Sequence, residues 1–542
     1  MSDQSYSNQA EKGGIPRRDL LKGLVGLPFL GLFGAGAVAQ SSYDNQLQEQ
    51  ILKELNIEAA VPPLPDLSGD PIRIGIIGYG IRGKQLLKAL GFVTEEWKEN
   101  MSAAAAKNSN DKRYETFMDQ VNNSNLNVRI TGVCDLFDVR AGEAIQAGTD
   151  SKGAPKRFRT YEEMLASPDI DAVVIATPDH WHAPISIAAA YAGKHVYVEK
   201  CMTHKFGETF ALRQAVHDSG IIFQVGHQHR QTQSFLTAMD VVKKNVLGHV
   251  SLIQANTNRN SDNGAWQYNI HEQANPSTID WQQFLGNAPQ IPFNAEHFFR
   301  WRKWWPYGTG LAGDLLTHDY DRINCLLKMG IPDAVISSGG IYTHRDGRDV
   351  PDVWQVVMEY PNYTTGTSQE SGKEKGLTFM YSSTLGNQYS RDTLLMGHDA
   401  TMLLGNTLFV YPDPRSTRYQ EMLKDKLVQP DVPLYGYNPA SKGGDGITSA
   451  TAAYFANKGL LYTYRNGKRV DSTHLHMREW LAAIRQNKPE LVSCGIEEGF
   501  QEAVSALMAC ASYKLGRKIE WNHDTQQLKN VSEAELEEVG MA

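Results

Sequence analysis

The stretch IRIGIIGYGIRGKQLLKALG, residues 72–91, decides the fold predicted for this chain. It opens with a run of β-forming residues that ends at a glycine, and its second half repeats apolar residues at helical spacing. The glycines between the halves are spaced G-x-G-x-x-G, which between a strand and a helix is typical of a dinucleotide-binding turn. Such glycines allow a tight turn, a close approach to a pyrophosphate and close helix–strand packing, while the helix N-terminus attracts the phosphates. The loop residues predicted to bind a cofactor are Gly78, Tyr79, Gly80, Ile81, Arg82 and Gly83.

The segments after this loop alternate between strands and helices up to about residue 230. Apolar strands are predicted at 127–135, 171–178, 195–200 and 221–226, and helices at 183–193 and 206–220. This alternation predicts βαβ units and a parallel sheet covered on both faces. The predicted fold class is therefore α/β, with a Rossmann domain over residues 71–230.

After about residue 245 the pattern changes to longer strands of alternating polarity. They are predicted at 249–258, 333–344, 353–361, 377–386 and 399–412, with helices at 311–329, 471–486 and 496–515. Such alternation is typical of a mainly antiparallel sheet with one packed face. We therefore predict a second, α+β domain over residues 231–525, followed by a tail at 526–542.

Polar residues stand at the predicted carboxyl ends of the parallel strands, where the ligands of doubly wound sheets bind. Asp135 ends the second strand, and a carboxylate there can accept the ribose hydroxyls of adenosine and repel a 2′-phosphate, which favours NAD over NADP. Asp135 lies farther from the glycine loop than the usual distance of about 20 residues, so residues 92–125 are interpreted as an insertion. Arg140 could approach a 2′-phosphate, which leaves NADP open, although a surface helix position is preferred. Three further strand ends, ATPDHWH (176–182), EKC (199–201) and GHQHRQ (226–231), contribute the predicted cofactor residues Thr177, Pro178, Glu199, Lys200 and Gln228.

The chain resembles the Gfo/Idh/MocA family of nicotinamide oxidoreductases over roughly residues 71–521. The matching motifs are GIIGYGIRG (75–83), VVIATPDHWH (173–182), AGKHVYVEK (192–200) and GLAGDLLTHDYDRINCLL (310–327). The resemblance implies a Rossmann domain followed by an α+β domain whose large open, mainly antiparallel sheet often mediates dimers or tetramers, and hence a homo-oligomer.

The same resemblance implies the catalytic residues. Lys200 matches the lysine of the family's E-K-P motif, which lies at the nicotinamide, and Asp314 with His318 matches its catalytic Asp-x-x-x-His pattern. Cys201 stands where the family has a proline, whose ring would fix φ after the lysine; it is interpreted as a small core residue. The segment WRKWWPYGTG (301–310) looks like exported bacterial branches of the family, and Arg302 within it is a further cofactor candidate.

Asp314 and His318 are four residues apart on a predicted helix, so they share one face. A neutral histidine is a natural acceptor for the hydroxyl proton of a sugar, and Lys200 would stabilise the developing alkoxide. Asp314 could hold the imidazole or bind a neighbouring hydroxyl. The aromatic group of Trp301, Trp304, Trp305, Tyr307 and His297 could stack on a sugar ring or form domain-interface core.

These residues predict an NAD(P)-dependent oxidoreductase acting on a hydroxyl of a sugar, polyol or cyclitol. One alternative is an NAD-dependent glycoside hydrolase or lyase, in which a transient oxidation permits elimination. A non-catalytic sugar-binding protein is a third possibility, which the joint presence of Lys200, Asp314 and His318 disfavours.

The N-terminus resembles a twin-arginine export signal over residues 1–39. Arg17 and Arg18 precede an apolar run rich in glycine and leucine, and AVA (37–39) fits a cleavage site. A retained membrane anchor is the alternative; after cleavage no stable membrane span is expected. Residues 40–70 are interpreted as a linker because AAVPPLPDLSGDP (59–71) is rich in proline. A periplasmic enzyme cannot draw on cytoplasmic NAD, so a tightly held cofactor is expected.

The composition of the chain argues against several other kinds of partner and site. The formal net charge of −8 argues against nucleic acid or anionic membrane as a partner. The five cysteines are widely spaced without a CxxC pair, which suggests neither a disulfide framework nor a zinc site. His180 and His182 are spaced i, i+2 without a partner carboxylate, so no metal is predicted.

Overall fold

The glycine loop follows the central strand of a six-stranded parallel sheet, in the order β3-β2-β1-β4-β5-β6. The computed structural model describes residues 63–107, 126–363, 375–438, 462–465 and 468–542, all within one unit, so the predicted signal peptide and most of the predicted linker lie outside the described residues. The strands are β1 (Ile72–Ile77), β2 (Val128–Cys134), β3 (Lys156–Arg157), β4 (Ala172–Ile175), β5 (His195–Val198) and β6 (Phe223–Val225). Each neighbouring pair runs parallel, which confirms the predicted Rossmann sheet.

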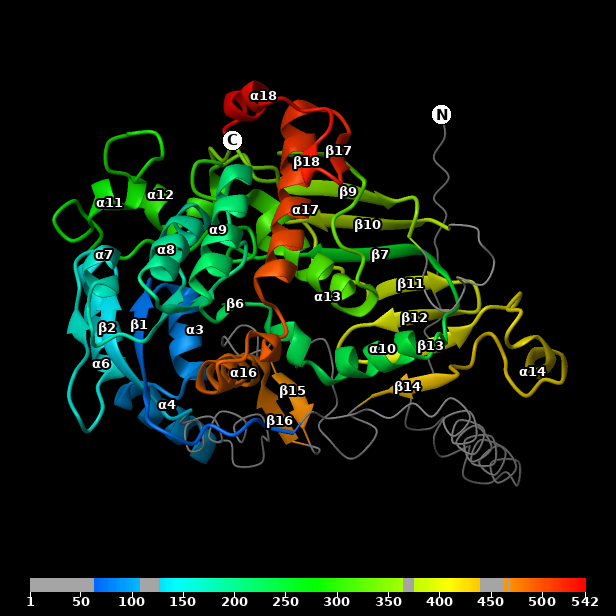
Figure 1. Ribbon diagram of the computed structural model, residues 1–542, viewed down its shortest axis with the longest axis horizontal. Coiled ribbons are helices and arrows are strands. Elements are labelled where there is room, and N and C mark those ends of the chain that lie inside the picture. The colour runs from blue at the N-terminus through cyan, green and yellow to red at the C-terminus, as the bar shows by residue number, and fades with distance from the viewer. Residues whose placement is uncertain (1–62, 108–125, 364–374, 439–461, 466–467) are drawn as a thin grey trace, which may run out of the picture. The chain divides into compact units, whose positions relative to one another are not determined.

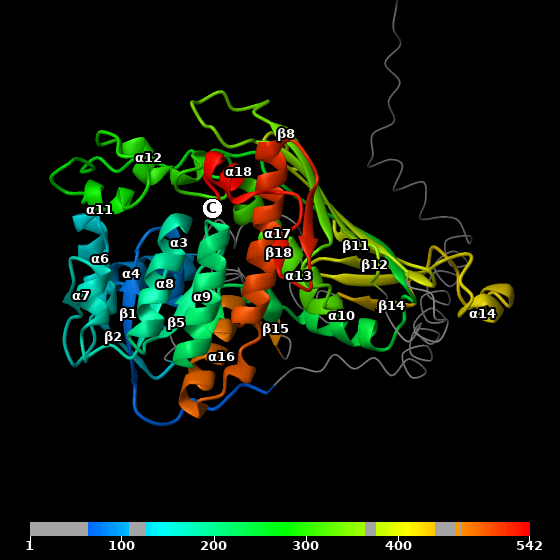
Figure 2. The ribbon, with the colours of Figure 1, turned by 45° about the horizontal axis from the view of Figure 1, so that its top comes forward.

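Helices cover this sheet on both faces, as Figures 1 and 2 show. One face buries α3 (Ile81–Ala89) and α6 (Asp138–Gly148) against β1 and β2. On the other, α8 (Asp179–Tyr191) packs on β4 and β5 and against α9 (Phe206–Ser219). The part of the predicted insertion that the structure describes includes α4 (Glu95–Lys107). The strand order reverses between β1 and β4, and this switch point at the carboxyl ends of the strands is where such sheets bind ligands.

The second sheet has ten strands in the order β14-β13-β12-β11-β7-β10-β9-β8-β17-β18. Only the β7–β10 pairing among those described in this sheet is parallel, so the prediction of a mainly antiparallel sheet is confirmed. Its strands are β7 (Val250–Asn258), β8 (Ala334–Gly340), β9 (Val353–Tyr360), β10 (Leu377–Thr384), β11 (Thr393–Gly397), β12 (Ala400–Leu404), β13 (Leu408–Pro412), β14 (Tyr435–Tyr437), β17 (Ile519–Asn522) and β18 (Gln527–Leu528).

Three helices lie along this sheet, α10 (Gln233–Lys243), α13 (Thr317–Leu327) and α17 (Ile496–Leu515). Helix α13 contacts both α10 and α17, and α17 packs on β8 while α10 packs on β12. On the strands, buried and less buried residues alternate, so one face is packed and the other is more open. The open face carries Ile336 and Met380, which are 43% and 41% exposed.

Sequence patterns missed several local features of this domain. The run 399–412 is a hairpin of β12 and β13 closed by a turn in which the Gly405 N–H donates to the Thr407 carbonyl. The helix predicted at 311–329 begins with a π-helical turn, η4 (Ala312–Leu316), before α13, and ends at Lys328 with φ +55°.

Segments near the C-terminus contact both domains. Helix α16 (Ser472–Gln486) lies in the range predicted for the second domain, yet Met477, Trp480 and Leu481 are buried in the Rossmann core against α3. The predicted tail contains β18 and a short helix, α18 (Glu533–Glu538), and the Phe206 N–H donates to the Met541 carbonyl. The last segment therefore ties the end of the chain to the Rossmann helix α9.

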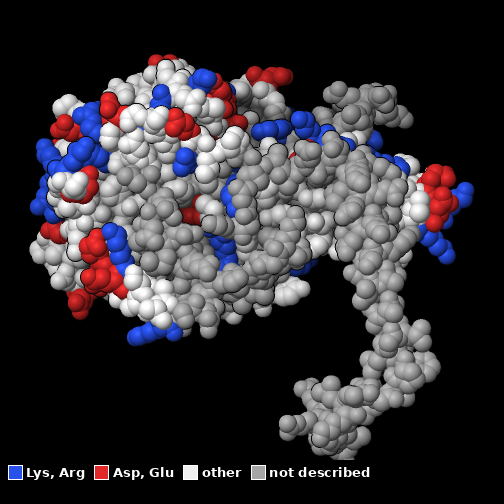
Figure 3. Space-filling view, turned by 90° about the horizontal axis from the view of Figure 1, so that it is seen from below, with Lys and Arg blue, Asp and Glu red and all other residues white. Residues whose placement is uncertain are grey.

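One face of the molecule shows how charged side chains are distributed over part of the described surface. Figure 3 shows acidic and basic side chains interspersed there. Among the described residues, no helix combines the length and the apolar composition that crossing a membrane would require.

Candidate active site

A cavity of about 630 Å³ opens where the carboxyl ends of β1, β2, β4 and β5 meet segments of the second domain. It contains side chains from both, so the glycine loop and the predicted catalytic residues face one space. Of the predicted site residues, those that line it are Gly78, Gly80, Ile81, Arg82, Asp135, Thr177, Pro178, Glu199, Lys200, Gln228, Arg302, Asp314 and His318.

The local geometry requires glycine at Gly78 and Gly83, and Gly80 leaves the backbone of the loop uncovered. Gly78 has φ +86°, and a Cβ there would lie 2.7 Å from the Ala176 carbonyl oxygen. A Cβ on Gly83 would overlap the Gly78 carbonyl, so this glycine lets α3 pack on the loop without lining the cavity. A Cβ on Gly80 would meet only the Arg140 Nη1 atom, at 3.7 Å, so this backbone is open toward the cavity. The loop therefore fits a dinucleotide phosphate.

Asp135 is fixed at the end of β2 by backbone donors. The Tyr79 N–H donates to its Oδ2 at 2.6 Å and the Phe137 N–H to its Oδ1 at 2.8 Å. Burial raises the pKa of Asp135, although the nearby Arg140 cation opposes this. The Tyr79 side chain itself is 6% exposed and belongs to the core, so its contribution to the site is made through its backbone.

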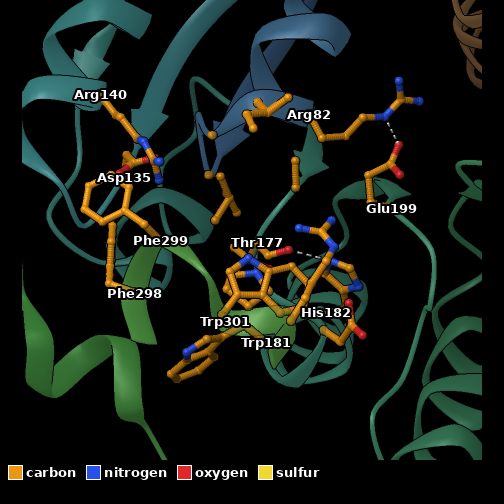
Figure 4. Close-up of a pocket in the computed structure, with 18 of the residues that line it drawn as sticks. Arg82, Asp135, Arg140, Thr177, Trp181, His182, Glu199, Phe298, Phe299 and Trp301 are labelled. Atoms are coloured by element: carbon orange, nitrogen blue, oxygen red, sulfur yellow. Dashed lines mark hydrogen bonds and ion pairs between the residues drawn. The ribbon is translucent and has the colours of Figure 1, made fainter. Parts of the chain in front are cut away.

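Arg140 lies beside Asp135 at this end of the cavity (Figure 4). Its guanidinium carbon lies 4.8 Å from the ring centroid of Phe299 and 5.6 Å from that of Phe298. The preferred interpretation of Arg140 as a surface residue is therefore wrong. Its side chain lines the cavity, where Phe298 and Phe299 of the second domain cover it.

Arg82 is neutralised by Glu199, which directly follows β5. Its Nε donates to Glu199 Oε1 at 2.7 Å, and its Nη2 donates to Gln228 Oε1 at 2.9 Å (Figure 4). Glu199 thus connects the glycine loop to β5 and pairs with Arg82, not with the adjacent Lys200.

Lys200 points away from Glu199, toward the second domain. Its Nζ donates to the Asp314 carbonyl at 2.7 Å and to Asp314 Oδ1 at 3.0 Å. Both side chains are about nine-tenths buried. The two adjacent charges that follow β5 therefore have two different partners.

Asp314 collects further donors. Arg302 Nε reaches its Oδ1 at 3.0 Å, and Trp266 Nε1 and Arg259 Nη1 reach its Oδ2 at 3.0 and 3.4 Å. Burial alone would raise the pKa of Asp314, but the Lys200, Arg302 and Arg259 cations hold it well below its usual range. Asp314 is therefore an ionised anchor for cations. Sequence reasoning missed Arg259 and Trp266, because they follow β7 without a motif.

His318 lies one turn farther on and is neutral. Its ring stands edge-on to His227 and His229, with ring centroids 5.6 and 5.4 Å away. Burial, with the nearby Lys200 cation, lowers the pKa of His318 well below its usual value. Its Nδ1 is buried without a hydrogen-bond partner among the described residues, and no hydrogen bond joins it to Asp314 there. The ring is thus available as a proton acceptor.

Other sequence candidates have structural roles. His182 bridges the Cys201 and Thr177 carbonyls at 2.7 and 2.8 Å, and His180 contacts the Phe284 carbonyl at 2.9 Å. Cys201 is fully buried; burial raises the pKa of its thiol well above the usual value, so it is a core residue. The Lys200–Cys201 peptide bond is cis. Of the predicted aromatic group, Trp301 lines the cavity, whereas Trp304, Trp305, Tyr307 and His297 do not.

One group of described residues has donor atoms close enough to hold a metal, namely His227, Asp321 and Cys494. Their atoms already serve an ion-pair network: His227 contacts Glu502, and Arg230 Nε donates to both Asp321 oxygens at 3.0 and 3.1 Å. We therefore assign no metal to this group of residues.

Comparison with known proteins finds a family model and several relatives that each match part of the chain. Residues 72–227 match the sequence model described as "Oxidoreductase family, NAD-binding Rossmann fold", which carries the Gfo/Idh/MocA label and is in agreement with the predicted nicotinamide cofactor. Levoglucosan dehydrogenase from Pseudarthrobacter phenanthrenivorans is 27% identical over 250 residues, which cover 42% of this chain and 57% of that protein. A protein named Glycosyl hydrolase family 109 protein 2, from Shewanella sp. (strain ANA-3), is 33% identical over 148 residues, covering 26% of this chain and 25% of that one. The chain thus spans less than two thirds of the length of these relatives.

The solved structure of levoglucosan dehydrogenase in complex with NADH and L-sorbose shares the fold. Its TM-score is 0.53 at 18% identity, and the match covers 83% of this chain and 99% of the other. This likeness confirms the order of domains predicted from the sequence, a Rossmann domain followed by an α+β domain.

Proposed function

We propose that this chain, whose residues 72–227 belong to the Gfo/Idh/MocA oxidoreductase family, is an exported oxidoreductase acting on CH–OH groups of a sugar, polyol or cyclitol. One observation carries the proposal: a single cavity joins the glycine loop to Lys200, Asp314 and His318. Relatives with similar Rossmann domains include a sugar dehydrogenase.

A bound nicotinamide would be held by the glycine loop, Asp135, Thr177 and Glu199, which line the cavity. When bound, it accepts or donates a hydride, chemistry that no protein side chain provides. NAD is the proposed form, because Asp135 stands at the end of β2; NADP stays open, because Arg140 lies beside it.

Lys200 and His318 act on the hydroxyl of the substrate. The ammonium of Lys200 donates a hydrogen bond to the reacting oxygen and stabilises the charge that develops on it. His318, held neutral by burial and by neighbouring cations, takes the hydroxyl proton. Asp314 is a positioning residue, because it fixes the Lys200 ammonium by two hydrogen bonds. Asp314 was predicted either to hold the imidazole of His318 or to bind a neighbouring hydroxyl. Among the described residues no hydrogen bond joins Asp314 to His318, so the first of these roles is not supported.

Export and retention of the cofactor form the second part of the proposal. The twin-arginine motif at 17–18 supports passage of a folded protein, and an exported enzyme needs a cofactor that stays bound. The test is to isolate the mature protein from the periplasm, denature it by heat and assay the supernatant for nicotinamide nucleotide. About one equivalent is expected; its absence from correctly folded periplasmic protein would contradict this part.

The reaction is tested by mixing purified, cofactor-loaded protein with sugars, polyols and cyclitols. Absorbance of the reduced nicotinamide should rise with at least one of them, in a single turnover. If no hydroxyl compound changes that absorbance, the oxidoreductase proposal fails.

A second candidate is an NAD-dependent glycoside hydrolase or lyase, favoured by the 33% identity to the family 109 glycosyl hydrolase protein. The same lysine and histidine suit a transient oxidation followed by elimination. Product analysis separates the two: release of a free sugar from a glycoside without net NADH supports this candidate.

The open face of the ten-stranded sheet supports a homo-oligomer. Ile336 and Met380 are exposed there, and paired sheets of this kind would cover them. Light scattering of the purified protein tests this; a monomer at micromolar concentration would contradict it.

A further inference from the structure

Positive charge exceeds negative charge at one end of the cavity. Lys200, Arg259 and Arg302 all approach the single carboxylate of Asp314. The only other carboxylate near Arg302 in the described cavity lining is that of Asp179, which accepts hydrogen bonds from the Thr309 N–H and hydroxyl at 3.0 and 2.7 Å. Among the described residues that line this end of the cavity, three cations face these two carboxylates, which leaves one positive charge uncompensated within the lining.

The two arginines also have donors to spare. Arg302 uses only its Nε, at 3.0 Å from Asp314, and its guanidinium carbon lies 4.2 Å from the ring centroid of Trp301. Arg259 uses only Nη1, in a long contact of 3.4 Å to the same carboxylate. In the part of the chain that the structure describes, no other hydrogen bond involves these guanidinium groups, and both line the cavity.

The phosphates of a dinucleotide do not account for this charge. They belong at the glycine loop, where Arg140 lies close to Gly80, and where Arg82 is already paired with Glu199. Arg259 and Arg302 come instead from the end of β7 and from the short helix η3 (Trp301–Lys303), and both meet at Asp314 beside Lys200. The uncompensated charge therefore lies where the substrate binds.

We propose, on the basis of the proposed function, that the substrate carries a carboxylate: a sugar acid such as a uronate or aldonate. The free Nη atoms of Arg259 and Arg302 hold the carboxylate, since guanidinium groups match its geometry with paired hydrogen bonds. The hydroxyl that reacts faces Lys200 and His318, and Trp301 packs on the apolar face of the ring. Arg302 thereby serves the substrate and not the cofactor, which differs from its sequence-based role.

The test compares a charged ligand with its neutral isostere. Isothermal titration calorimetry on the cofactor-loaded protein measures the dissociation constants of sodium D-glucuronate and D-glucuronamide. We expect glucuronate to bind at least about tenfold more tightly, because hydrogen bonds to a charged group are the stronger ones. Equal affinity, or preference for the amide, would overturn the inference.

Two glutamine variants test whether Arg259 and Arg302 cause the preference for the charged ligand. Arg259→Gln and Arg302→Gln should each reduce the acid-to-amide affinity ratio by about tenfold, and Arg302→Lys should restore part of it. Arg129→Gln, which removes a surface pair with Asp150, is the control and should leave the ratio unchanged. An unchanged ratio in both site variants, or loss of bound nicotinamide from Arg302→Gln with the ratio intact, would overturn the inference.

The outcome is separable from that of the proposed function. If neutral sugars reduce the bound nicotinamide and glucuronate binds no more tightly than glucuronamide, the sugar-acid inference fails and the oxidoreductase proposal stands. If glucuronate binds with the expected preference but no hydroxyl compound reduces the nicotinamide, the oxidoreductase proposal fails and the anion site stands.

Discussion

The two ends of the cavity are built in different ways. At the glycine-loop end, the ligand-binding groups are mainly backbone: Gly78 and Gly80 leave room, and Asp135 is fixed by two backbone N–H donors. At the Asp314 end they are side chains, since three cations and one indole converge on a single carboxylate. The first end is formed within one βαβ unit. The second draws on segments from β5, β7, η3 and η4, which are far apart in the sequence.

This difference has a physical consequence. A backbone cradle is insensitive to the charge of its neighbours, so it can hold any dinucleotide phosphate by shape and helix dipole. A carboxylate shared by several cations depends on each of them, because removing one changes the position and charge of the rest. Mutations at the Asp314 end should therefore change turnover and specificity, whereas mutations at the loop end should change cofactor content.

The largest effect is expected for Lys200→Met. Removing the ammonium should lower kcat/KM by about 10³-fold, as for loss of a donor to a developing oxyanion. Bound nicotinamide should stay near the wild-type level, because the glycine loop, Asp135 and Glu199, which are proposed to hold it, are unchanged. Steady-state kinetics and cofactor assay check both, with the exposed Lys152→Met as control. Wild-type turnover in Lys200→Met would remove Lys200 from the mechanism.

The reverse pattern is expected for Gly83→Ala. The new Cβ would overlap the Gly78 carbonyl and distort the loop, so cofactor affinity should fall by about tenfold or more. Helix propensity favours the change by about 1 kcal/mol, so the loss cannot come from helix stability. Gly142→Ala is the matched control, since Gly142 is also helical and its Cβ would meet nothing within 4 Å. Equal cofactor content in the two variants would show that the loop does not bind it.

The pH profile tests the neutral state of His318. Its pKa is depressed by burial and by Lys200, so the base form persists as pH falls through the usual histidine value of about 6.5. We expect kcat/KM to stay nearly level down to about pH 5.5, where a histidine with the ordinary pKa would already have cost about tenfold. An acid limb at pH 6.5 that disappears in His318→Gln would contradict this.

The smallest effect is expected for Asp135→Asn. The amide removes the charge that repels a 2′-phosphate and keeps an acceptor oxygen for one of the two backbone donors, so the preference for NAD over NADP should fall about three- to tenfold. Kinetics with both cofactors check the ratio. If the wild-type protein prefers NADP, Arg140 and not Asp135 decides which cofactor binds.

The loop end was predictable from the sequence because its signals are local. Gly78, Gly80 and Gly83 are close together, and the strand before them is mostly apolar. Lys200, Asp314 and His318 came from a family resemblance, not from periodicity. The contacts of Arg259 and Trp266 with Asp314, the inward turn of Arg140 and the packing of α16 on the Rossmann core were not predictable, because they depend on how distant segments pack.

If both ends of the cavity serve one reaction, hydride transfer depends on Lys200 while cofactor occupancy does not. The most direct test is a single-turnover experiment on wild-type protein and Lys200→Met, each loaded with one equivalent of oxidised nicotinamide and mixed with a turned-over sugar or sugar acid. We expect rapid formation of reduced nicotinamide in the wild type and a rate about 10³-fold slower in the variant, at equal cofactor occupancy. Equal rates in the two proteins, or no reduction in the wild type with any hydroxyl substrate, would contradict it.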